Sequence, residues 1–175
     1  MILNILAYIL VFLFLLPDEC AKERVHVRVL SDISARSMTY RASKSSIKKL
    51  ILIRPDSPVK SNTLRQRPER KTYSITCKIS NYEYLRDGSF RLTLQDLKDT
   101  TISMIADIPN PDCDVMADCT KLEEIRSVFN NFMGQYRIPD TELVEAGTYK
   151  IQGVLFFNPN KETQISPIIG IKKIS

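Results

Sequence analysis

The feature that most constrains this fold is a regular alternation of apolar and polar residues that begins at Lys71. Every second residue in three successive segments is apolar, which is typical of strands with one buried face. The three segments are KTYSITCKIS (71–80), SFRLTLQD (89–96) and TTISMIADI (100–108). An Asp87-Gly88 pair separates the first two and is typical of a hairpin turn. Residues 71–108 therefore predict a three-stranded antiparallel meander.

A helix and two further strands follow the meander. Thr120 and Glu123 have the spacing of a capping box, and Gly134 is a suitable C-cap. Between them, apolar residues recur at steps of three and four and form one helical stripe: Leu122, Ile125, Phe129, Phe132 and Met133. The two strands are predicted at GTYKIQGVLFFN (147–158) and QISPIIGIKKI (164–174). A glycine inside each of these strands indicates a bulge or a bend.

The order of three strands, one helix and two strands is that of the OB-fold. We therefore expect a mainly β protein, a five-stranded OB-like barrel with one helix between strands 3 and 4. The rival architecture is an α+β sheet with the helix across one face. The strand glycines and the tight turns favour the barrel, because a closed sheet needs sharply coiled strands.

The N-terminal segment predicts export. Residues 2–16 are apolar apart from Asn4, and fifteen helical residues span roughly 22 Å, less than a bilayer core of about 30 Å. This length favours a signal peptide over residues 1–21. An uncleaved membrane anchor and a lipid anchor at Cys20 are the alternatives, since no Lys or Arg precedes the run and no A-x-A site follows it. The expected location is periplasmic or envelope-associated.

Positive charge is concentrated directly after this leader. Residues 22–71 hold 14 Lys and Arg against 4 Asp and Glu, whereas residues 72–175 hold 11 against 14. Residues 22–70 are therefore interpreted as a basic, partly disordered linker, in which VHVRV (25–29) alternates like a short strand. The alternative is a tether to anionic lipid, polysaccharide or nucleic acid, to which each Lys or Arg contributes about 1 kcal/mol at a lipid surface.

The region from residue 71 to 174 resembles a group of small uncharacterised bacterial proteins with an OB-fold-like domain. The resemblance lies in DGSFRLTLQD, TTISMIADIPNPDC, GTYKIQGVLFF and ISPIIGIKKI. The corresponding patterns in that group are D-G-D before an apolar strand, T-M-I-A-E-I-P-x-P-x-C, V-x-G-V-x-F-F-D and E-L-H-P-hydrophobic. It implies a fold and no established activity. This chain departs at Ser89, Asn158 and Ser166, where the group has Asp, Asp and His, and it lacks a longer loop before the last strand.

No enzyme class is favoured by the polar residues, and no cofactor is expected. A single histidine, His26, argues against His-based triads and zinc sites. Six aspartates resemble a metal cluster when taken together: Asp96, Asp99, Asp107, Asp112, Asp114 and Asp118. They lack the fixed spacing and turning glycine of a calcium loop, so no metal site is predicted. A calcium-dependent nuclease is the runner-up, because RIPDTE (137–142) superficially resembles an OB-type nuclease motif.

Nucleic-acid binding on the barrel face requires outward aromatic and basic side chains. The outward positions of the first two strands are mostly hydroxylated: Thr72, Ser74, Thr76, Lys78, Arg91, Thr93 and Gln95. The candidate ligand-binding residues are Lys78, Tyr82, Tyr84 and Arg91. Because the charge of this domain is slightly negative, nucleic acid is not favoured, and a peptide or a glycan suits such a face equally well.

Three cysteines follow the leader. Cys77 has the inward phase of its strand and is interpreted as a buried thiol. Cys113 and Cys119 bracket the step into the helix, and in an exported protein they form either a disulfide or two free thiols. The sequence therefore predicts an exported, non-catalytic OB-like binding or structural module for a protein, peptide or glycan. Its basic linker would hold it near an anionic surface, and a nucleic-acid binder or nuclease is the alternative.

Overall fold

The computed structural model describes residues 25–28, 30, 32, 34–35, 38–60, 62–110, 122–136, 147–159 and 162–175. Four predictions lie wholly or partly outside these residues: the leader over residues 1–21, the Cys113–Cys119 pairing, the capping box at Thr120 and the RIPDTE motif at 137–142. None of the helices in the described part is long and apolar enough to cross a membrane.

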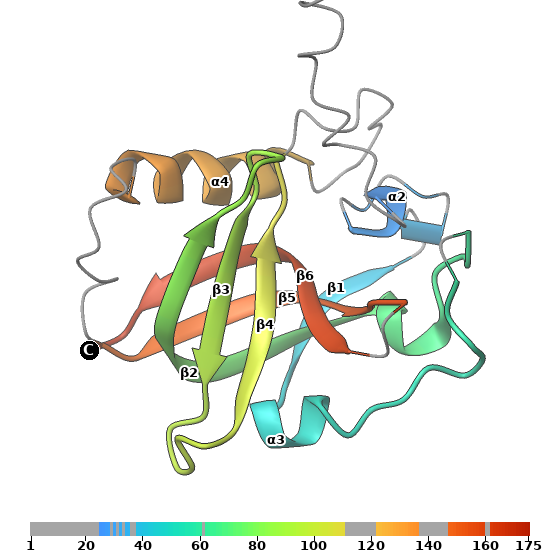
Figure 1. The fold of residues 1–175 in the computed structure, drawn as a ribbon, viewed down its shortest axis with the longest axis horizontal. Helices are drawn as coiled ribbons and strands as arrows, with labels where there is room; N and C mark the ends of the chain where they lie inside the picture. The colour runs from blue at the N-terminus through green and yellow to red at the C-terminus, as the bar shows by residue number, and fades with distance from the viewer. Residues whose placement is uncertain are drawn as a thin grey trace, which may run out of the picture.

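Five strands close into a barrel, as the sequence pattern predicted (Figure 1). They are β2 (Lys71–Tyr84), β3 (Phe90–Gln95), β4 (Ser103–Ile108), β5 (Tyr149–Phe157) and β6 (Thr163–Lys173). The order around the barrel is β2-β3-β4-β6-β5, and β5 pairs back with β2 to complete the circle. The seam between β4 and β6 is parallel and pairs at Ala106 and Ile165, while the other contacts are antiparallel. The OB-like prediction is confirmed.

The helix α4 (Leu122–Tyr136) lies between β4 and β5 in the chain and across one end of the barrel (Figure 1). Its apolar stripe closes the core there, since Ile125, Phe129 and Phe132 are all buried. The ring of Phe132 lies 4.9 Å from that of Phe90, the first residue of β3. Gly134 does not cap this helix, because the helix continues for two more residues to Tyr136. An exposed glycine is tolerated there at a modest cost in helix propensity.

Two glycines take up the conformations that the sequence indicated. Gly88 has a φ of +76° in the turn between β2 and β3, where the Asp87 carboxylate accepts the Ser89 amide at 3.0 Å. Gly153 lies at a register shift between β5 and β6. The strands approach so closely there that a β-carbon on Gly153 would lie 2.8 Å from the carbonyl oxygen of Pro167.

The linker interpretation is wrong for residues 38–60 and 62–70, which form part of the fold. The strand β1 (Thr39–Lys44) adds to the sheet beside β2 in parallel register. The short helix α3 (Ile47–Leu50) buries both of its terminal residues, and the 3-10 turn η3 (Arg67–Arg70) leads into β2. Backbone pairing and a few buried apolar side chains hold this segment, so its high charge did not prevent folding.

Residues 25–28 of the predicted VHVRV strand form a helical turn instead. This turn, α2 (Val25–Arg28), lies over the barrel beside a second apolar cluster. The cluster joins three residues that follow α2, Leu30, Ala35 and Met38, to Ile125 of α4 and Val154 of β5. Thr72, the cross-strand partner of Val154, and Ser74 are buried, although strand alternation predicted that they face solvent. The alternation was correct, but the outer face of β2 is covered at this end.

Candidate functional site

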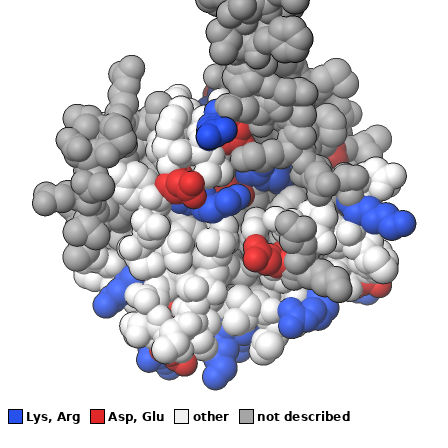
Figure 2. Space-filling view, in the orientation of Figure 1, with Lys and Arg blue, Asp and Glu red and all other residues white. Residues whose placement is uncertain are grey.

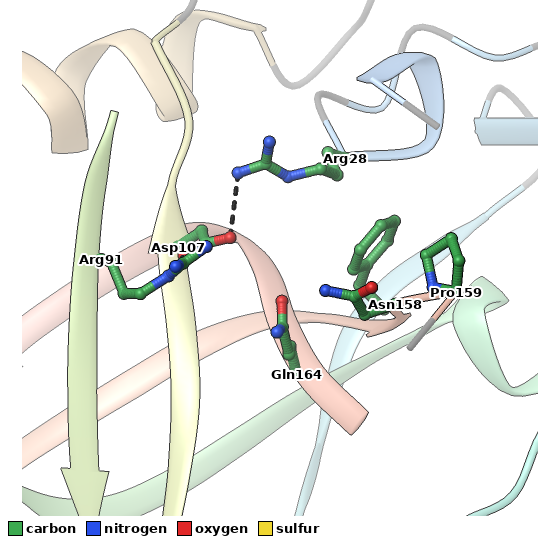
Figure 3. A pocket seen from close by; sticks show the side chains of 7 residues that line it. Arg28, Arg91, Asp107, Asn158, Pro159 and Gln164 are labelled. Atoms are coloured by element: carbon green, nitrogen blue, oxygen red, sulfur yellow. Dashed lines mark hydrogen bonds and ion pairs between the residues drawn. The ribbon is translucent and has the colours of Figure 1, made fainter. Parts of the chain in front are cut away.

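A pocket of about 190 Å³ lies where α2 meets β3, β4 and the β5–β6 hairpin (Figure 3). We call it the arginine pocket. Its lining comprises Arg28, Arg91, Asp107, Phe156, Asn158, Pro159 and Gln164. These residues come from α2, from the four strands β3 to β6 and from the turn that follows β5. Only the folded chain brings them together.

Asp107 is the centre of an ion cluster in this pocket. Its Oδ2 accepts a hydrogen bond from Arg28 Nη2 at 2.9 Å, and its Oδ1 accepts one from Arg91 Nε at 3.2 Å. The Asp107 side chain is 1% exposed and that of Arg28 7%, whereas the Arg91 side chain is 35% exposed. Two guanidinium groups therefore share one carboxylate, with Arg91 on the solvent side.

Strand register explains why Arg91 and Asp107 meet. The two residues are direct partners in the antiparallel β3–β4 pair, so their side chains point to the same face. Their neighbours Leu92 and Ala106 point inward and are fully buried. Asp107 thus lies on the outer face of the barrel, and it is buried because α2 and Arg28 cover it (Figure 3).

The opposite wall comes from the β5–β6 hairpin. Asn158 donates its backbone N–H to the carbonyl oxygen of Glu162 at 3.0 Å, which closes the hairpin. Gln164 is 3% exposed, and its side-chain amide donates to the Glu162 carboxylate at 3.3 Å. Phe156 and Pro159 give this wall an apolar surface (Figure 3). The pocket therefore offers charge on one side and amide groups beside apolar carbon on the other.

Of the four candidate ligand-binding residues, the structure places one in this pocket. Arg91 lines it. Lys78 is exposed but pairs with Gln95 at the other end of β3. Tyr82 and Tyr84 pack against aromatic rings, at 6.0 Å from Phe132 and 5.0 Å from Phe90 respectively. The four residues do not form a common site.

Sequence reasoning missed the other polar residues of the pocket. Asp107 had been grouped with the other acids, and the signal that could have separated it is its register with Arg91 across a predicted hairpin. Asn158 is one of the three departures from the resembling proteins and is the one that lines the pocket. Ser89 instead accepts the Asn110 amide at 3.1 Å, and Ser166 is fully buried.

Two other aspartates of the six that resembled a metal cluster have local structural roles. Asp96 and Asp99 shape the turn between β3 and β4, where their side-chain oxygens accept backbone N–H groups of the same turn. Hydrogen bonds from Thr101 hold the pKa of Asp99 below its usual range. Among the described residues, which exclude positions 112, 114 and 118, no three His, Cys, Asp or Glu side chains gather as a metal site would require.

Cys77 is buried in the barrel core and unpaired. Burial, with a smaller contribution from the Asp96 carboxylate, raises the pKa of its thiol to about 12. The thiolate is the reactive form of cysteine. This residue is therefore a packing group and not a nucleophile.

The arrangement is suited to binding. None of the seven lining side chains is a Ser, Thr, Cys, His or Lys, and the one carboxylate has an arginine on each oxygen. Comparison with protein-family models, with curated proteins and with solved structures finds no match to this chain.

Proposed function

We propose that the protein is an exported, non-catalytic OB-like binding module that holds a protein, peptide or glycan ligand at the arginine pocket. The observation that carries this proposal is the convergence of charged, amide and apolar side chains from five elements on one concave site. Such mixed lining is typical of ligand pockets. At about 190 Å³ the pocket is smaller than most small-molecule sites, so it suits one sugar residue or one side chain of a larger ligand.

The test is a titration of the full chain with a panel of peptides and oligosaccharides, followed by amide chemical shifts in ¹H–¹⁵N spectra. We expect the largest changes at the amides of Arg91, Asp107 and Gln164. Asn158→Ala should weaken binding, because it removes a lining amide while leaving the backbone bond that closes the hairpin. Lys78→Ala is the control outside the pocket. Shift changes confined to other surfaces would overturn this assignment of the site.

The alternative function is nucleic-acid binding or calcium-dependent nuclease action. Two arginines beside a carboxylate favour it, because phosphodiester chemistry uses such groups. Against it, both Asp107 oxygens already accept guanidinium N–H groups, and Ca²⁺ takes six to eight oxygen ligands. We expect no cleavage of plasmid DNA with calcium. Cleavage that Asp107→Asn abolishes would establish the nuclease instead.

A basic surface supports the further proposal that the module is held near an anionic surface. Exposed Lys and Arg side chains gather on β1, on α3 and just after it, at Arg41, Lys44, Lys48, Lys49 and Arg54. Figure 2 shows Lys and Arg along the lower edge of the molecule, where α3 lies in Figure 1. We expect sedimentation with anionic vesicles that declines steeply with salt. A Lys48→Glu, Lys49→Glu variant should lose it, and equal sedimentation with zwitterionic vesicles would contradict the proposal.

Export is tested through the apolar N-terminal segment. We expect a phosphatase that is active only outside the cytoplasm to become active when residues 1–40 are fused to it. Phe12→Asp and Leu13→Asp together would break the apolar run and should abolish the activity. An active fusion with the broken run would contradict the proposed route.

A further inference from the structure

We infer that the arginine pocket is a subsite for a single oxyanion, a carboxylate or phosphate group of the ligand, held between Arg28 and Arg91. The inference rests on the proposed binding function and specifies what the pocket recognises. It is carried by three properties of the pocket: its charge, its unused donors and its size.

Charge is the first property. The cluster holds two guanidinium groups and one carboxylate, so it has one excess positive charge. Arg28 is 6% exposed and Asp107 1%, which leaves little water to solvate that charge on their side. A buried charge is stabilised only when it is paired and hydrogen-bonded. An anion in the pocket would make the cluster neutral.

Hydrogen-bond donors are the second property. Each guanidinium carries five N–H groups, and each uses one of them on Asp107. Each of the two Asp107 oxygens already accepts one guanidinium N–H, whereas eight guanidinium N–H groups are not used on Asp107. The cluster therefore presents an excess of donors to the pocket and a shortage of acceptors, which is the complement of an oxyanion.

Size and surroundings are the third property. A volume of about 190 Å³ accommodates a carboxylate or phosphate with the first atoms of its carrier. The side-chain amides of Asn158 and Gln164 lie on the wall opposite the arginines (Figure 3). Phe156 and Pro159 replace water on that wall, and exclusion of water strengthens an ionic hydrogen bond. The pocket thus favours a compact anion over a flat or extended ligand.

Two further carboxylates neighbour residues that line the pocket and are expected to influence which anions it admits. Glu162 accepts the Gln164 amide at 3.3 Å, and Glu83 is the cross-strand partner of Arg91 on β2. Within the described part of the chain, the ion pairs of Arg28 and Arg91 are with Asp107 and not with these two acids. They repel an anion that stays at the rim, so the ligand's oxyanion is expected to enter between the two arginines. Asp107 is a positioning residue that fixes both guanidinium groups.

The experiment uses the full chain and small probes at constant ionic strength. Inorganic phosphate and acetate are titrated separately, with acetamide as the neutral counterpart of acetate, and amide shifts are recorded. We expect saturable changes at β3, β4 and β6 with one or both anions and none with acetamide. The anion that binds with the higher affinity identifies the group that the ligand carries.

Variants assign the effect to the pocket. Arg91→Gln and Arg28→Gln should each weaken binding of the anion about tenfold or more, since each removes a charge-assisted donor set. Arg91→Lys keeps the charge and the packing but removes the guanidinium group. A several-fold weaker affinity for the anion in this variant would therefore come from loss of the guanidinium geometry and not from loss of the fold. Arg67→Gln in η3 makes the same charge change on an exposed arginine outside both the pocket and the basic surface and should leave the affinity within twofold.

Three outcomes would overturn the inference. Equal weakening by Arg67→Gln would show general attraction to a basic protein, and equal binding of acetamide would show that charge is not recognised. Occupation of the pocket by a neutral peptide or sugar, with no binding of either anion, would refute the oxyanion subsite and leave the proposed binding function intact. If no member of the ligand panel perturbs the pocket, the proposed function itself fails.

Discussion

The Asp99 carboxylate is held by its own turn. Its Oδ1 accepts the Thr101 amide at 3.1 Å and the Thr101 hydroxyl as well. Hydrogen bonds to the ionised form lower the pKa, so the turn is stabilised above the usual Asp range and this stabilisation is lost as the pH falls through the lowered pKa. We expect Thr101→Val to raise the pKa of Asp99 in an NMR titration of its carboxyl carbon.

Thr100→Val is the matched control for this change. The backbone carbonyl oxygen of Thr100 accepts the Gln95 side-chain amide at 2.7 Å. Because this hydrogen bond uses the backbone, Thr100→Val leaves it in place. The pKa of Asp99 should stay where it is in this variant. An equal rise in both variants would mean that the Thr101 hydroxyl is not the cause.

Cys77 shows how burial suppresses reactivity. With a thiol pKa of about 12 instead of 9.0, the thiolate fraction at pH 8 is about a thousandfold lower than for a free cysteine. We expect iodoacetamide to modify Cys77 far more slowly in the folded chain than in urea, because burial also blocks the reagent, as measured on the Cys77 peptide by mass spectrometry. Similar rates in the two states would contradict the burial of this thiol.

The same group lowers the stability of the folded chain at alkaline pH. The unfolded thiol ionises above about pH 9, whereas the folded one keeps its proton up to about 12. The unfolded state therefore binds fewer protons in this range, and the free energy of unfolding falls as the pH rises. In the Cys77→Ala variant, the free energy of unfolding should fall less steeply between about pH 9 and 12.

At the scale of elements, the close approach of β5 and β6 depends on a missing side chain. A β-carbon at Gly153 would clash with Ile165 and lie 2.8 Å from the Pro167 carbonyl oxygen. We expect Gly153→Ala to lower the free energy of unfolding by about 2 kcal/mol, within the usual range for overpacking. Chemical denaturation followed by circular dichroism measures this.

Gly134 provides the matched control, because it receives the same substitution in open space. No heavy atom lies within 4 Å of its added β-carbon, and it is inside α4. Gly134→Ala should raise the free energy of unfolding by about 0.5 to 1 kcal/mol through helix propensity. If both variants were destabilised alike, the close contact at Gly153 would not be the reason.

From residue 71 onward, the order of strands and helix was predictable from the sequence. The elements before residue 71 were not predictable. The strands β2, β3 and β4 alternate in sequence because one face of each packs into the core, and β5 alternates over its first half. The strand β1 reads TYRASK and has no such alternation. Its place is set by backbone pairing with β2, which leaves no mark on side-chain pattern.

The site was predictable only in part for a related reason. Arg91 was expected to face outward because it alternates with Phe90 and Leu92, and the structure has it so. Arg28 comes from a segment 79 residues before Asp107, and no local pattern connects the two. The pocket is a product of tertiary packing, and its residues carry no common motif.

At the scale of the whole molecule, two arginine–aspartate pairs fasten α2 and the residues just after it to the rest of the fold. Arg28 pairs with Asp107, and Asp32 pairs with Arg65. Arg65 is 2% exposed and also donates to the carbonyl oxygens of Val27 at 2.7 Å and Glu69 at 3.0 Å. Ion pairs at Arg28 and at Asp32 thus hold α2 and the residues just after it at two points.

Arg65→Gln should release this segment. We expect a loss of about 3 kcal/mol in the free energy of unfolding, as for other broken buried pairs. Hydrogen exchange should accelerate at the Ala35 and Met38 amides, whose bonds lie in the segment. Arg67→Gln, an exposed arginine in η3, is the control, and equal acceleration in both variants would contradict the fastening role.

The barrel seam has a consequence for the order of events during folding. Strands β4 and β6 meet at Ala106 and Ile165, with α4 and β5 between them in the chain. Contacts between such distant residues require closure of a long loop and are slow to form. Asp107 is next to Ala106, and Gln164 is next to Ile165, so the pocket forms as the seam closes. Ligand binding is therefore expected to appear late in refolding kinetics.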